Sequence, residues 1–240
     1  MKKLVSQVRA ALDSYKMIEP NDRIAIGVSG GKDSLVLLCA MAQIRRFYPI
    51  PFDIVAITID PCFSGLQTDY SQIQELCRRL DVKLVIKRSQ IGQIVFDERK
   101  EKNPCSLCAR MRRGLLHDTT LEAGCNKIAL GHHFDDAVQT FFMNLFNEGR
   151  IGCFSPVTYL SRKNIHMIRP LVFCEETLIQ SVVNRYSIPV EKSRCPADGA
   201  TERENTKDLL SKLEKTYPDL KKKVLGAMQR ANLNGWQKIS

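Results

Sequence analysis

The sequence predicts an α/β fold: a doubly wound parallel sheet with helices on both faces and added basic helices. Short apolar runs alternate along the chain with longer segments of helical periodicity, as in parallel strands joined by crossover helices. The 240 residues, 44% of them hydrophobic, are enough for one large domain with a helical appendage. Because such crossovers are right-handed almost without exception, a doubly wound sheet is the simplest arrangement.

The predicted elements follow one another in a regular order. The chain opens with an amphipathic helix, in which apolar residues recur at helical spacing: Leu4, Val8, Ala11 and Tyr15. Short apolar runs predict strands at 23–28, 53–59, 83–86 and 127–130. Helical patterns follow these strands at 33–48, 67–80, 105–123 and 135–147, the third after a long connection.

Beyond Gly149 the pattern becomes looser. The runs 157–159 and 166–168 are expected to form a short strand pair or an additional edge strand. Residues 175–186 have the pattern of a helix, and the last thirty-five residues that of one or two basic helices. The helical additions are therefore expected at the C-terminal end of the chain.

The net charge of +10 is unevenly distributed. Residues 87–113 carry eight lysines and arginines against three carboxylates, so they contribute half of the excess. Lys221, Lys222 and Lys223 add a basic run near the C-terminus. Charge informs about partners rather than fold, and a positive cluster beside candidate chemistry favours a nucleic acid over an ordinary basic surface.

Signals for export or membrane insertion do not stand out in the sequence. No run approaches the roughly 18 apolar residues of a membrane span, and the N-terminus lacks the continuous apolar stretch of a signal peptide. Nine cysteines, an odd number, argue against a fully paired disulfide framework. We therefore expect a cytoplasmic protein without a membrane partner, in which Cys39, Cys77 and Cys174 are buried core residues.

The segment Gly27-Val-Ser-Gly-Gly-Lys-Asp-Ser34 joins the first strand to its helix. Glycines such as Gly30 let the backbone adopt positive φ and bring its N–H groups close to an anion. The helix that follows directs its unpaired N–H groups and its positive dipole end at the same point. Lys32 adds a point charge, and Ser29 and Ser34 add hydroxyl donors. These features predict a phosphate-binding loop.

The spacing within this loop excludes two common phosphate motifs. A Walker P-loop has four residues between its first glycine and its Gly-Lys pair, with Ser or Thr directly after the lysine. Here three residues separate Gly27 from Gly31, and Asp33 follows Lys32. The pattern is not GxGxxG either, which disfavours a dinucleotide site. Lys32 and Asp33 are the candidate catalytic residues of the loop.

A second polar segment, Gly131-His-His-Phe-Asp-Asp136, follows the fourth strand. Sheets of this kind bind ligands at the carboxyl ends of their strands, so this segment is expected at a ligand site. Asp135 and Asp136 fit two interpretations: they cap the following helix, or one of them holds Mg²⁺ or orients the nucleophile. In the second interpretation, His132 or His133 faces the substrate. Asp60, at the end of the second strand, is a weaker candidate for contacting adenosine.

Three cysteines stand apart from the predicted core. Cys105 and Cys108 lie at the start of a predicted helix with i, i+3 spacing, which puts both sulfurs on one face. Cys195 lies in a loop beyond the core. Four interpretations remain open: structural thiols, a redox disulfide, zinc with His117 or a loop histidine as fourth ligand, and a [4Fe-4S] cluster on three thiolates.

The loop resembles the Ser-Gly-Gly-x-Asp-Ser signature of the PP-loop ATP pyrophosphatases, which have a Rossmann-like α/β fold of the HUP type. The resemblance implies that ATP is cleaved between its α- and β-phosphates, with Mg²⁺ assisting. The loop would grip pyrophosphate while a substrate oxygen takes the adenylyl group. The residues expected to contact ATP are Ser29, Gly30, Gly31, Lys32, Asp33, Ser34, Asp60 and Gly131.

With the three cysteines included, the chain resembles the tRNA 2-thiocytidine synthetase family over roughly residues 20–215. The matching stretches are Ser29–Ser34, Cys105–Leu116, Ile128–Asp136, Ile168–Leu171 and the lone Cys195. The resemblance implies ATP-dependent thiolation of cytidine at position 32 of tRNA. The C2 oxygen of the base would be adenylylated and then displaced by sulfur carried on an open iron. Cys105, Cys108 and Cys195 would hold that [4Fe-4S] cluster.

The same resemblance implies partners and a division of the chain. The partners would be tRNA and a sulfur donor, either a cysteine desulfurase or sulfide, and the oligomeric state stays open between monomer and homodimer. Residues 1–20 would form an N-terminal helix and 21–190 the PP-loop domain. Residues 191–240 would hold the cluster-ligand loop and basic helices that cradle tRNA.

Three other functions remain open at this point. A tRNA 2-thiouridine synthetase would use the same chemistry on another base. A PP-loop ligase would take ammonia or an amine as the nucleophile, although no glutaminase domain is present to supply ammonia. A non-enzymatic iron–sulfur or zinc sensor would bind RNA and retain only nucleotide binding.

Overall fold

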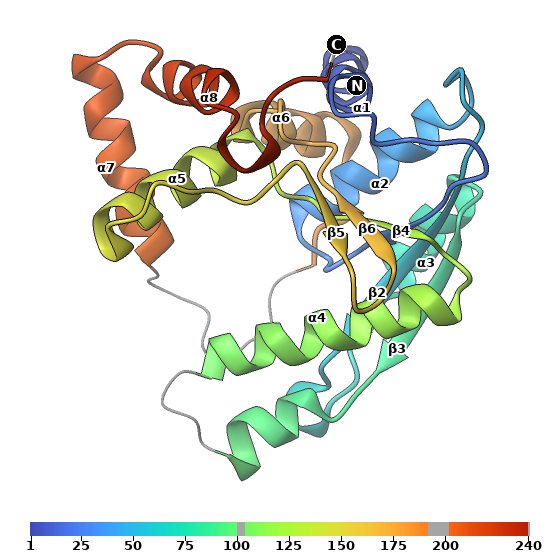
Figure 1. Cartoon of the computed structure of the whole chain (residues 1–240). Coiled ribbons are helices and arrows are strands. Elements are labelled where there is room, and N and C mark those ends of the chain that lie inside the picture. The colour runs from blue at the N-terminus through green and yellow to red at the C-terminus, as the bar shows by residue number, and fades with distance from the viewer. Residues whose placement is uncertain (100–103, 192–201, 240) are drawn as a thin grey trace.

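Six strands form one sheet in the order β3-β2-β1-β4-β6-β5 in the computed structural model, which describes residues 1–99, 104–191 and 202–239 (Figure 1). All neighbouring strands are parallel except the outermost pair, β5 and β6. The predicted α/β fold with a mainly parallel sheet is confirmed. The strands are β1 Arg23–Gly27, β2 Asp53–Asp60, β3 Lys83–Arg88, β4 Lys127–Ala129, β5 Val157–Leu160 and β6 Ile165–Ile168.

The helices cover both faces of the sheet, as the alternation of buried residues along the strands requires. Ile24 and Ile26 of β1 belong to one core cluster, and Ala25 between them belongs to the other. Helix α4 lies on one face, whereas α1, α2 and α6 lie on the other (Figure 1). The helices are α1 Lys2–Ser14, α2 Lys32–Ile44, α3 Ser71–Arg79, α4 Pro104–Glu122, α5 Phe134–Glu148, α6 Glu176–Tyr186, α7 Glu202–Thr216 and α8 Leu220–Arg230.

Two segments differ from the sequence-based expectation. The runs near 157 and 166 form both a strand pair and an edge, because β6 pairs in parallel with β4 and β5 returns antiparallel beside it. The long connection before α4 contains a π-helix, Gln93–Glu98. This helix was not predicted, because the sequence of the connection has no clear periodicity. Cys39, Cys77 and Cys174 are buried, as expected. Among the described helices, none is long and apolar enough to cross a membrane.

The C-terminal helices are not a separate layer. Helices α7 and α8 pack on each other and on α5 (Figure 1). Leu210, Leu225 and Met228 belong to the same core cluster as Leu4 of α1. Residues from the start, middle and end of the chain thus share one core, which holds the basic C-terminal helices against α5.

Trp236 is packed in this core near the C-terminus, so its replacement by a small residue is expected to destabilise the protein strongly. Its side chain is fully buried, its Nε1–H donates to the Phe154 carbonyl at 2.7 Å, and its ring meets Tyr15 edge-on at 6.1 Å. Trp236→Ala should lower the free energy of unfolding by about 3–5 kcal/mol. Urea unfolding followed by circular dichroism measures this, with the exposed Tyr217→Ala as the control expected within about 0.5 kcal/mol of the parent. Equal midpoints for both variants would contradict the packing role of Trp236.

Candidate functional site

The loop between β1 and α2 is held in shape by its own two serines. The Ser29 N–H donates to Ser34 Oγ at 3.1 Å, and the Ser34 hydroxyl donates to the Gly31 carbonyl at 2.9 Å. Gly30 has a φ of +86°, a conformation that favours glycine. Helix α2 begins at Lys32, directly after the loop. The unpaired N–H groups of its first turn therefore stand at the loop, as an anion site requires.

The segment after β4 lies directly against this loop. A Cβ atom on Gly131 would be 3.0 Å from both the Asp33 carbonyl carbon and the Ser34 nitrogen. Such a contact is tighter than most Cβ atoms make, so a larger residue at this position would push the two backbones apart. The structure thus brings together the two polar segments that the sequence singled out, at the carboxyl ends of the neighbouring strands β1 and β4.

Lys32 and Asp33 form the charged centre of the site. The Lys32 ammonium lies 3.2 Å from Asp33 Oδ2 and 3.2 Å from Glu176 Oε1. Burial disfavours the charged ammonium, but the two carboxylates outweigh it and raise the pKa of Lys32. Asp33 Oδ1 is buried and has no hydrogen-bond partner in the described protein. The site therefore contains a carboxylate oxygen with free lone pairs.

Asp135 and Asp136 have every carboxylate oxygen engaged. Asp135 Oδ2 accepts the Glu176 N–H at 2.8 Å and its Oδ1 lies 3.1 Å from the Lys221 ammonium. Asp136 Oδ2 accepts the His133 N–H at 3.0 Å, and its Oδ1 pairs with the Arg203 guanidinium. The predicted capping of the following helix, α5, therefore holds for Asp136, whereas Asp135 accepts an N–H from the start of α6 instead.

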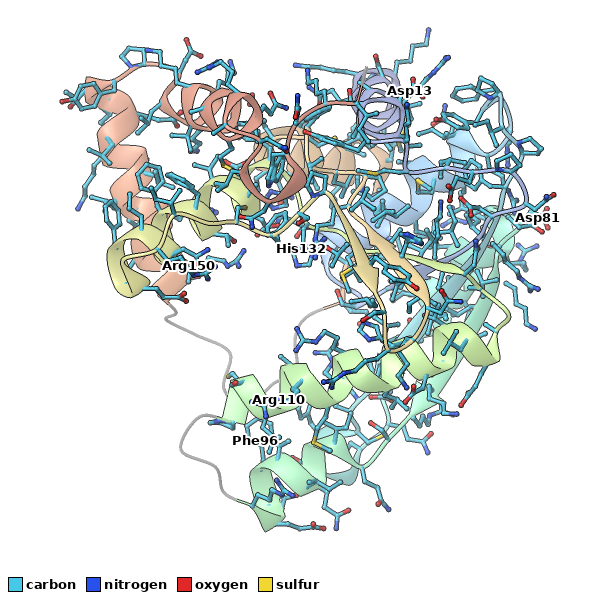
Figure 2. All side chains as sticks on the ribbon, in the orientation of Figure 1. Asp13, Asp81, Phe96, Arg110, His132 and Arg150 are labelled. Atoms are coloured by element: carbon cyan, nitrogen blue, oxygen red, sulfur yellow. The ribbon has the colours of Figure 1, made fainter. Side chains whose placement is uncertain are left out.

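The two histidines occupy different surroundings. His133 Nε2 lies 3.8 Å from Asp33 Oδ1 and 3.5 Å from Asp136 Oδ2, so His133 is the imidazole at the loop. His132, labelled near the middle of the molecule in Figure 2, has its ring 5.2 Å from that of Phe154. Burial, with Arg169 adding to it, lowers the pKa of His132 to about 4, so its imidazole is neutral. The role of His132 as a catalytic residue stays a prediction.

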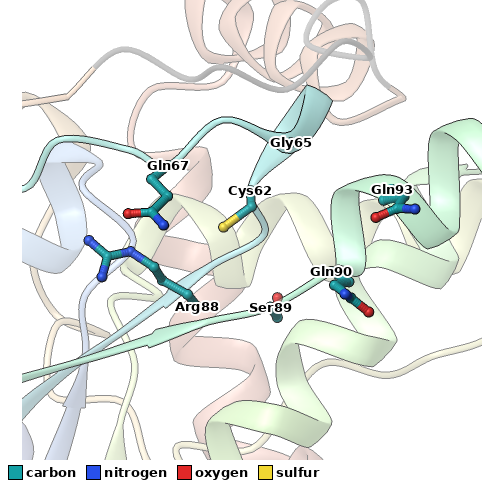
Figure 3. A pocket seen from close by; sticks show the side chains of 7 residues that line it. All are labelled: Cys62, Gly65, Gln67, Arg88, Ser89, Gln90 and Gln93. Carbon is teal, nitrogen blue, oxygen red and sulfur yellow. The ribbon is translucent and has the colours of Figure 1, made fainter.

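Asp60 builds the loop that follows β2. Its side chain is fully buried and accepts the N–H groups of Cys62 and Thr68 together with the Thr68 hydroxyl. Beside this loop is a cavity of about 360 Å³, and three glutamines are among the residues that line it (Figure 3). Its lining residues are Cys62, Gly65, Gln67, Arg88, Ser89, Gln90 and Gln93. Contact between Asp60 and adenosine stays a prediction, since both carboxylate oxygens already have partners.

Two of the three singled-out cysteines lie in the first turns of α4. Cys105 is exposed and Cys108 is buried, while Cys195 lies outside the described residues. Within residues 1–99, 104–191 and 202–239, no group of three or more His, Cys, Asp or Glu is arranged to hold a metal. His117 follows Cys108 by nine residues on the same continuous helix, about 13 Å along its axis. The interpretation of His117 as a zinc ligand beside Cys108 is therefore wrong.

Several charged residues of the site were missed by sequence reasoning. Glu176 is the first residue of α6, and acidic residues are common in the first turn of a helix because they stabilise the helix dipole. Its position in the sequence therefore did not indicate a role in the site. Its two cationic partners, Lys32 and Lys207, come from α2 and α7, and only the folded structure shows them as neighbours. The residues missed at this site are Glu176, Arg203, Lys207 and Lys221.

Comparison with known proteins agrees with this architecture. A family model described as the PP-loop domain matches residues 2–209. The tRNA-cytidine(32) 2-sulfurtransferase of Syntrophotalea carbinolica is 34% identical over 221 residues, 91% of this chain and 85% of that protein. The protein of the same name from Geobacter sulfurreducens is 35% identical over 230 residues, 95% of this chain and 89% of its own length.

Solved structures extend the comparison. The U34-tRNA thiolase NcsA from Methanococcus maripaludis, with its [4Fe-4S] cluster, superposes with a TM-score of 0.78 at 26% identity. The match covers 96% of this chain and 78% of that one. The NH3-dependent NAD synthetase from Campylobacter jejuni, at 14% identity and a TM-score of 0.50 over 98% of this chain and 95% of its own, shares the fold. The chain therefore belongs to the PP-loop family and, by its relatives, to the family of the tRNA-cytidine(32) 2-sulfurtransferases.

Proposed function

We propose that the protein is an ATP-dependent tRNA sulfurtransferase that converts cytidine 32 of tRNA to 2-thiocytidine. The observation that carries the proposal is the loop Ser29–Ser34, with the Gly131 backbone against it and free N–H groups at the start of α2. This arrangement suits a pyrophosphate group. The names of the relatives supply the substrate and the base position.

The proposed reaction has two steps. In the first, the C2 oxygen of the base bonds to the α-phosphorus of ATP and the bond to the pyrophosphate oxygen breaks. Lys32 and the loop N–H groups stabilise the charge that develops on the leaving pyrophosphate. In the second, a sulfur nucleophile bonds to C2, and AMP leaves with the original oxygen. Ser29, Gly30, Gly31 and Ser34 are assigned to binding ATP, and Asp60 and Gly131 to the adenosine side of the site.

Asp33 suits Mg²⁺, which would assist the first step by neutralising phosphate charge. Its Oδ1 is buried without a hydrogen-bond partner among the described residues, and a carboxylate oxygen is a ligand that Mg²⁺ prefers. Asp135 or Asp136 would hold Mg²⁺ or orient the nucleophile. In the described structure these two carboxylates pair with Lys221 and Arg203. His133 stands between Asp33 and Asp136, within reach of both.

Cys105, Cys108 and Cys195 are proposed to hold a [4Fe-4S] cluster, which would supply the sulfur-carrying iron when bound. Cys105 and Cys108 fit this as two thiols one helical turn apart at the start of α4, one exposed and one buried. The thiolase NcsA carries such a cluster in its structure. We assign Cys195 to the third position from the sequence, since it lies outside the described residues.

The partners follow from the same proposal. The tRNA would bind to the basic segment 87–113 and to the C-terminal helices. Those helices belong to the proposed unit 191–240. The donor of sulfur is a cysteine desulfurase or sulfide, the enzyme works in the cytoplasm, and a homodimer is its proposed assembly. The units 1–20 and 21–190 are proposed as an N-terminal helix and the PP-loop domain.

The first test is nucleoside mass spectrometry on tRNA from cells with and without the gene. Loss of 2-thiocytidine supports both the reaction and its substrate. Loss of a thiolated uridine instead keeps the mechanism and moves the target to the base that NcsA acts on. An unchanged set of thionucleosides would overturn the proposal in favour of an amine-using ligase or an RNA-binding sensor.

Gly131→Ala is expected to weaken ATP binding without unfolding the protein. The added Cβ would meet loop backbone at 3.0 Å, so the loop must shift and its N–H groups lose alignment with the phosphates. We expect about a tenfold rise in the Kd for ATP, measured by calorimetry. Gly114→Ala, where no atom lies within 4 Å of the added Cβ, is the matched control and should bind normally. An unchanged Kd for Gly131→Ala would show that the loop tolerates the shift.

A further inference from the structure

Three carboxylates of the site are each paired with a cation from the C-terminal helices. Asp136 pairs with Arg203 and Glu176 with Lys207, both from α7, and Asp135 pairs with Lys221 from α8. Helix α7 packs on α5, whose first turn contains the two aspartates (Figure 1). The C-terminal helices are therefore attached to the nucleotide site by charge as well as by packing.

Glu176 is the one of these carboxylates that also contacts the loop lysine. Its Oε1 lies 3.2 Å from the Lys32 ammonium, and its Oε2 lies 2.7 Å from the Lys207 ammonium. Burial would raise the pKa of Glu176, but Lys207 and Lys32 outweigh it and lower that pKa to about 2. Glu176 therefore carries a full negative charge between two cations, one on α2 and one on α7.

This charge poses a problem when a triphosphate enters the loop. Lys32 then has the phosphates as its main partner, and a carboxylate close to Lys32 repels the same phosphates. A second cation on the far oxygen of Glu176 reduces this repulsion and keeps the carboxylate in place. Lys207 occupies that position, with its ammonium 2.7 Å from Glu176 Oε2.

We propose that Lys207 is a positioning residue of the ATP site, which neutralises Glu176 and thereby lets Lys32 engage the triphosphate. The inference rests on the proposed function, because it takes ATP as the ligand of the loop. It makes α7 a working part of the nucleotide site, in addition to the tRNA-binding role proposed for the C-terminal unit. Lys207 acts through Glu176 and touches neither ATP nor the transferred group.

A double-mutant cycle tests this dependence directly. The readout is the Kd for Mg²⁺ and α,β-methylene-ATP, an analogue that cannot be cleaved between those phosphates, by calorimetry at fixed ionic strength. Lys207→Ala should weaken binding about fivefold in the parent protein, the order expected for one uncompensated charge near a partly solvated ligand. In the Glu176→Gln background, Lys207→Ala should change the Kd by less than about twofold, since no charge is left to neutralise.

Two variants separate this role from a general effect of charge or fold. Lys207→Arg keeps the cation and should bind the analogue like the parent. Lys212→Ala removes an exposed lysine from the same helix and should leave the Kd unchanged. A melting temperature of Lys207→Ala within about 2 °C of the parent is expected, since a half-exposed pair contributes little to stability.

Two results would overturn the proposal. If Lys207→Ala weakens analogue binding equally in both backgrounds, Lys207 acts on the phosphates directly or through the fold. If Lys207→Ala does not weaken binding in the parent, the Lys207–Glu176 pair does not contribute to ATP binding. The binding assay contains no tRNA and no sulfur donor. Failure of the cycle therefore leaves the thiolation proposal intact, and unchanged thionucleosides in cells leave the cycle interpretable.

Discussion

Replacing Asp33 by asparagine should slow tRNA-dependent pyrophosphate release by about a hundredfold to a thousandfold. Asparagine keeps the shape of the side chain but removes the charge that pairs with Lys32 at 3.2 Å, and it replaces the carboxylate whose unpartnered Oδ1 is proposed for Mg²⁺ by a neutral amide, a weaker metal ligand. Losses of this size are typical when one preorganised electrostatic group is removed from a transition state. A coupled assay of pyrophosphate, with saturating tRNA and Mg²⁺, measures the effect.

The matched control for this variant is Asp208→Asn, which makes the same chemical change at an exposed position on α7. It should release pyrophosphate like the parent. Iron content is a second readout. Asp33 is not one of the proposed cluster ligands, so its replacement should leave the iron content unchanged. Full activity of Asp33→Asn would show that the assignment of this loop as the catalytic centre is wrong.

Cys108→Ser is expected to abolish thiolation while leaving ATP binding unchanged. A thiolate, rather than a neutral hydroxyl, is the ligand that iron requires, so the variant should lose its iron and its product together. We expect more than about a hundredfold loss of 2-thiocytidine formation, since even removal of a partner of a metal ligand commonly costs 10- to 100-fold. Iron analysis, the visible absorption of anaerobically prepared protein and product mass spectrometry provide the three measurements.

Cys39→Ser makes the same change at a buried thiol of the core and serves as the control. Burial raises the pKa of Cys39 to about 11, so this thiol is neutral and inert at physiological pH. The control should keep its iron and its activity, with some loss of stability. If Cys108→Ser retains the iron content of the parent, the start of α4 does not hold the cluster.

Local patterns predicted most of the fold. Each strand of the parallel part is a short apolar run, and the alternation of Ile24, Ala25 and Ile26 between two cores shows why both faces needed cover. The phosphate loop was predictable for the same reason, because its glycines, its serines and the following helix are adjacent in sequence. The contact of Gly131 with Asp33 was not predicted, because it depends on β1 and β4 being neighbours in the sheet, and only the structure shows that strand order.

The charged partners of the site could not be predicted in the same way. Glu176 and Lys32 are far apart in sequence, and Lys207 lies on a helix whose exposed charges resemble any solvated surface. Nothing in the order of residues distinguishes the lysine that pairs with the partly buried Glu176 from one that only contacts water. The choice between His132 and His133 depended likewise on which ring the fold places beside Asp33, which the pair of identical residues does not encode.

The packing of Trp236 has a practical optical consequence. It is the only tryptophan of the chain, and its ring lies 6.1 Å from that of Phe154, which in turn lies 5.2 Å from the ring of His132, the neighbour of His133 in the chain. The protein thus contains one indole, which is shielded from water and is linked through the rings of Phe154 and His132 to the segment 131–136. Its emission offers a label-free signal for titrating ligands into the unmodified enzyme, free of the overlapping contributions that several indoles would give.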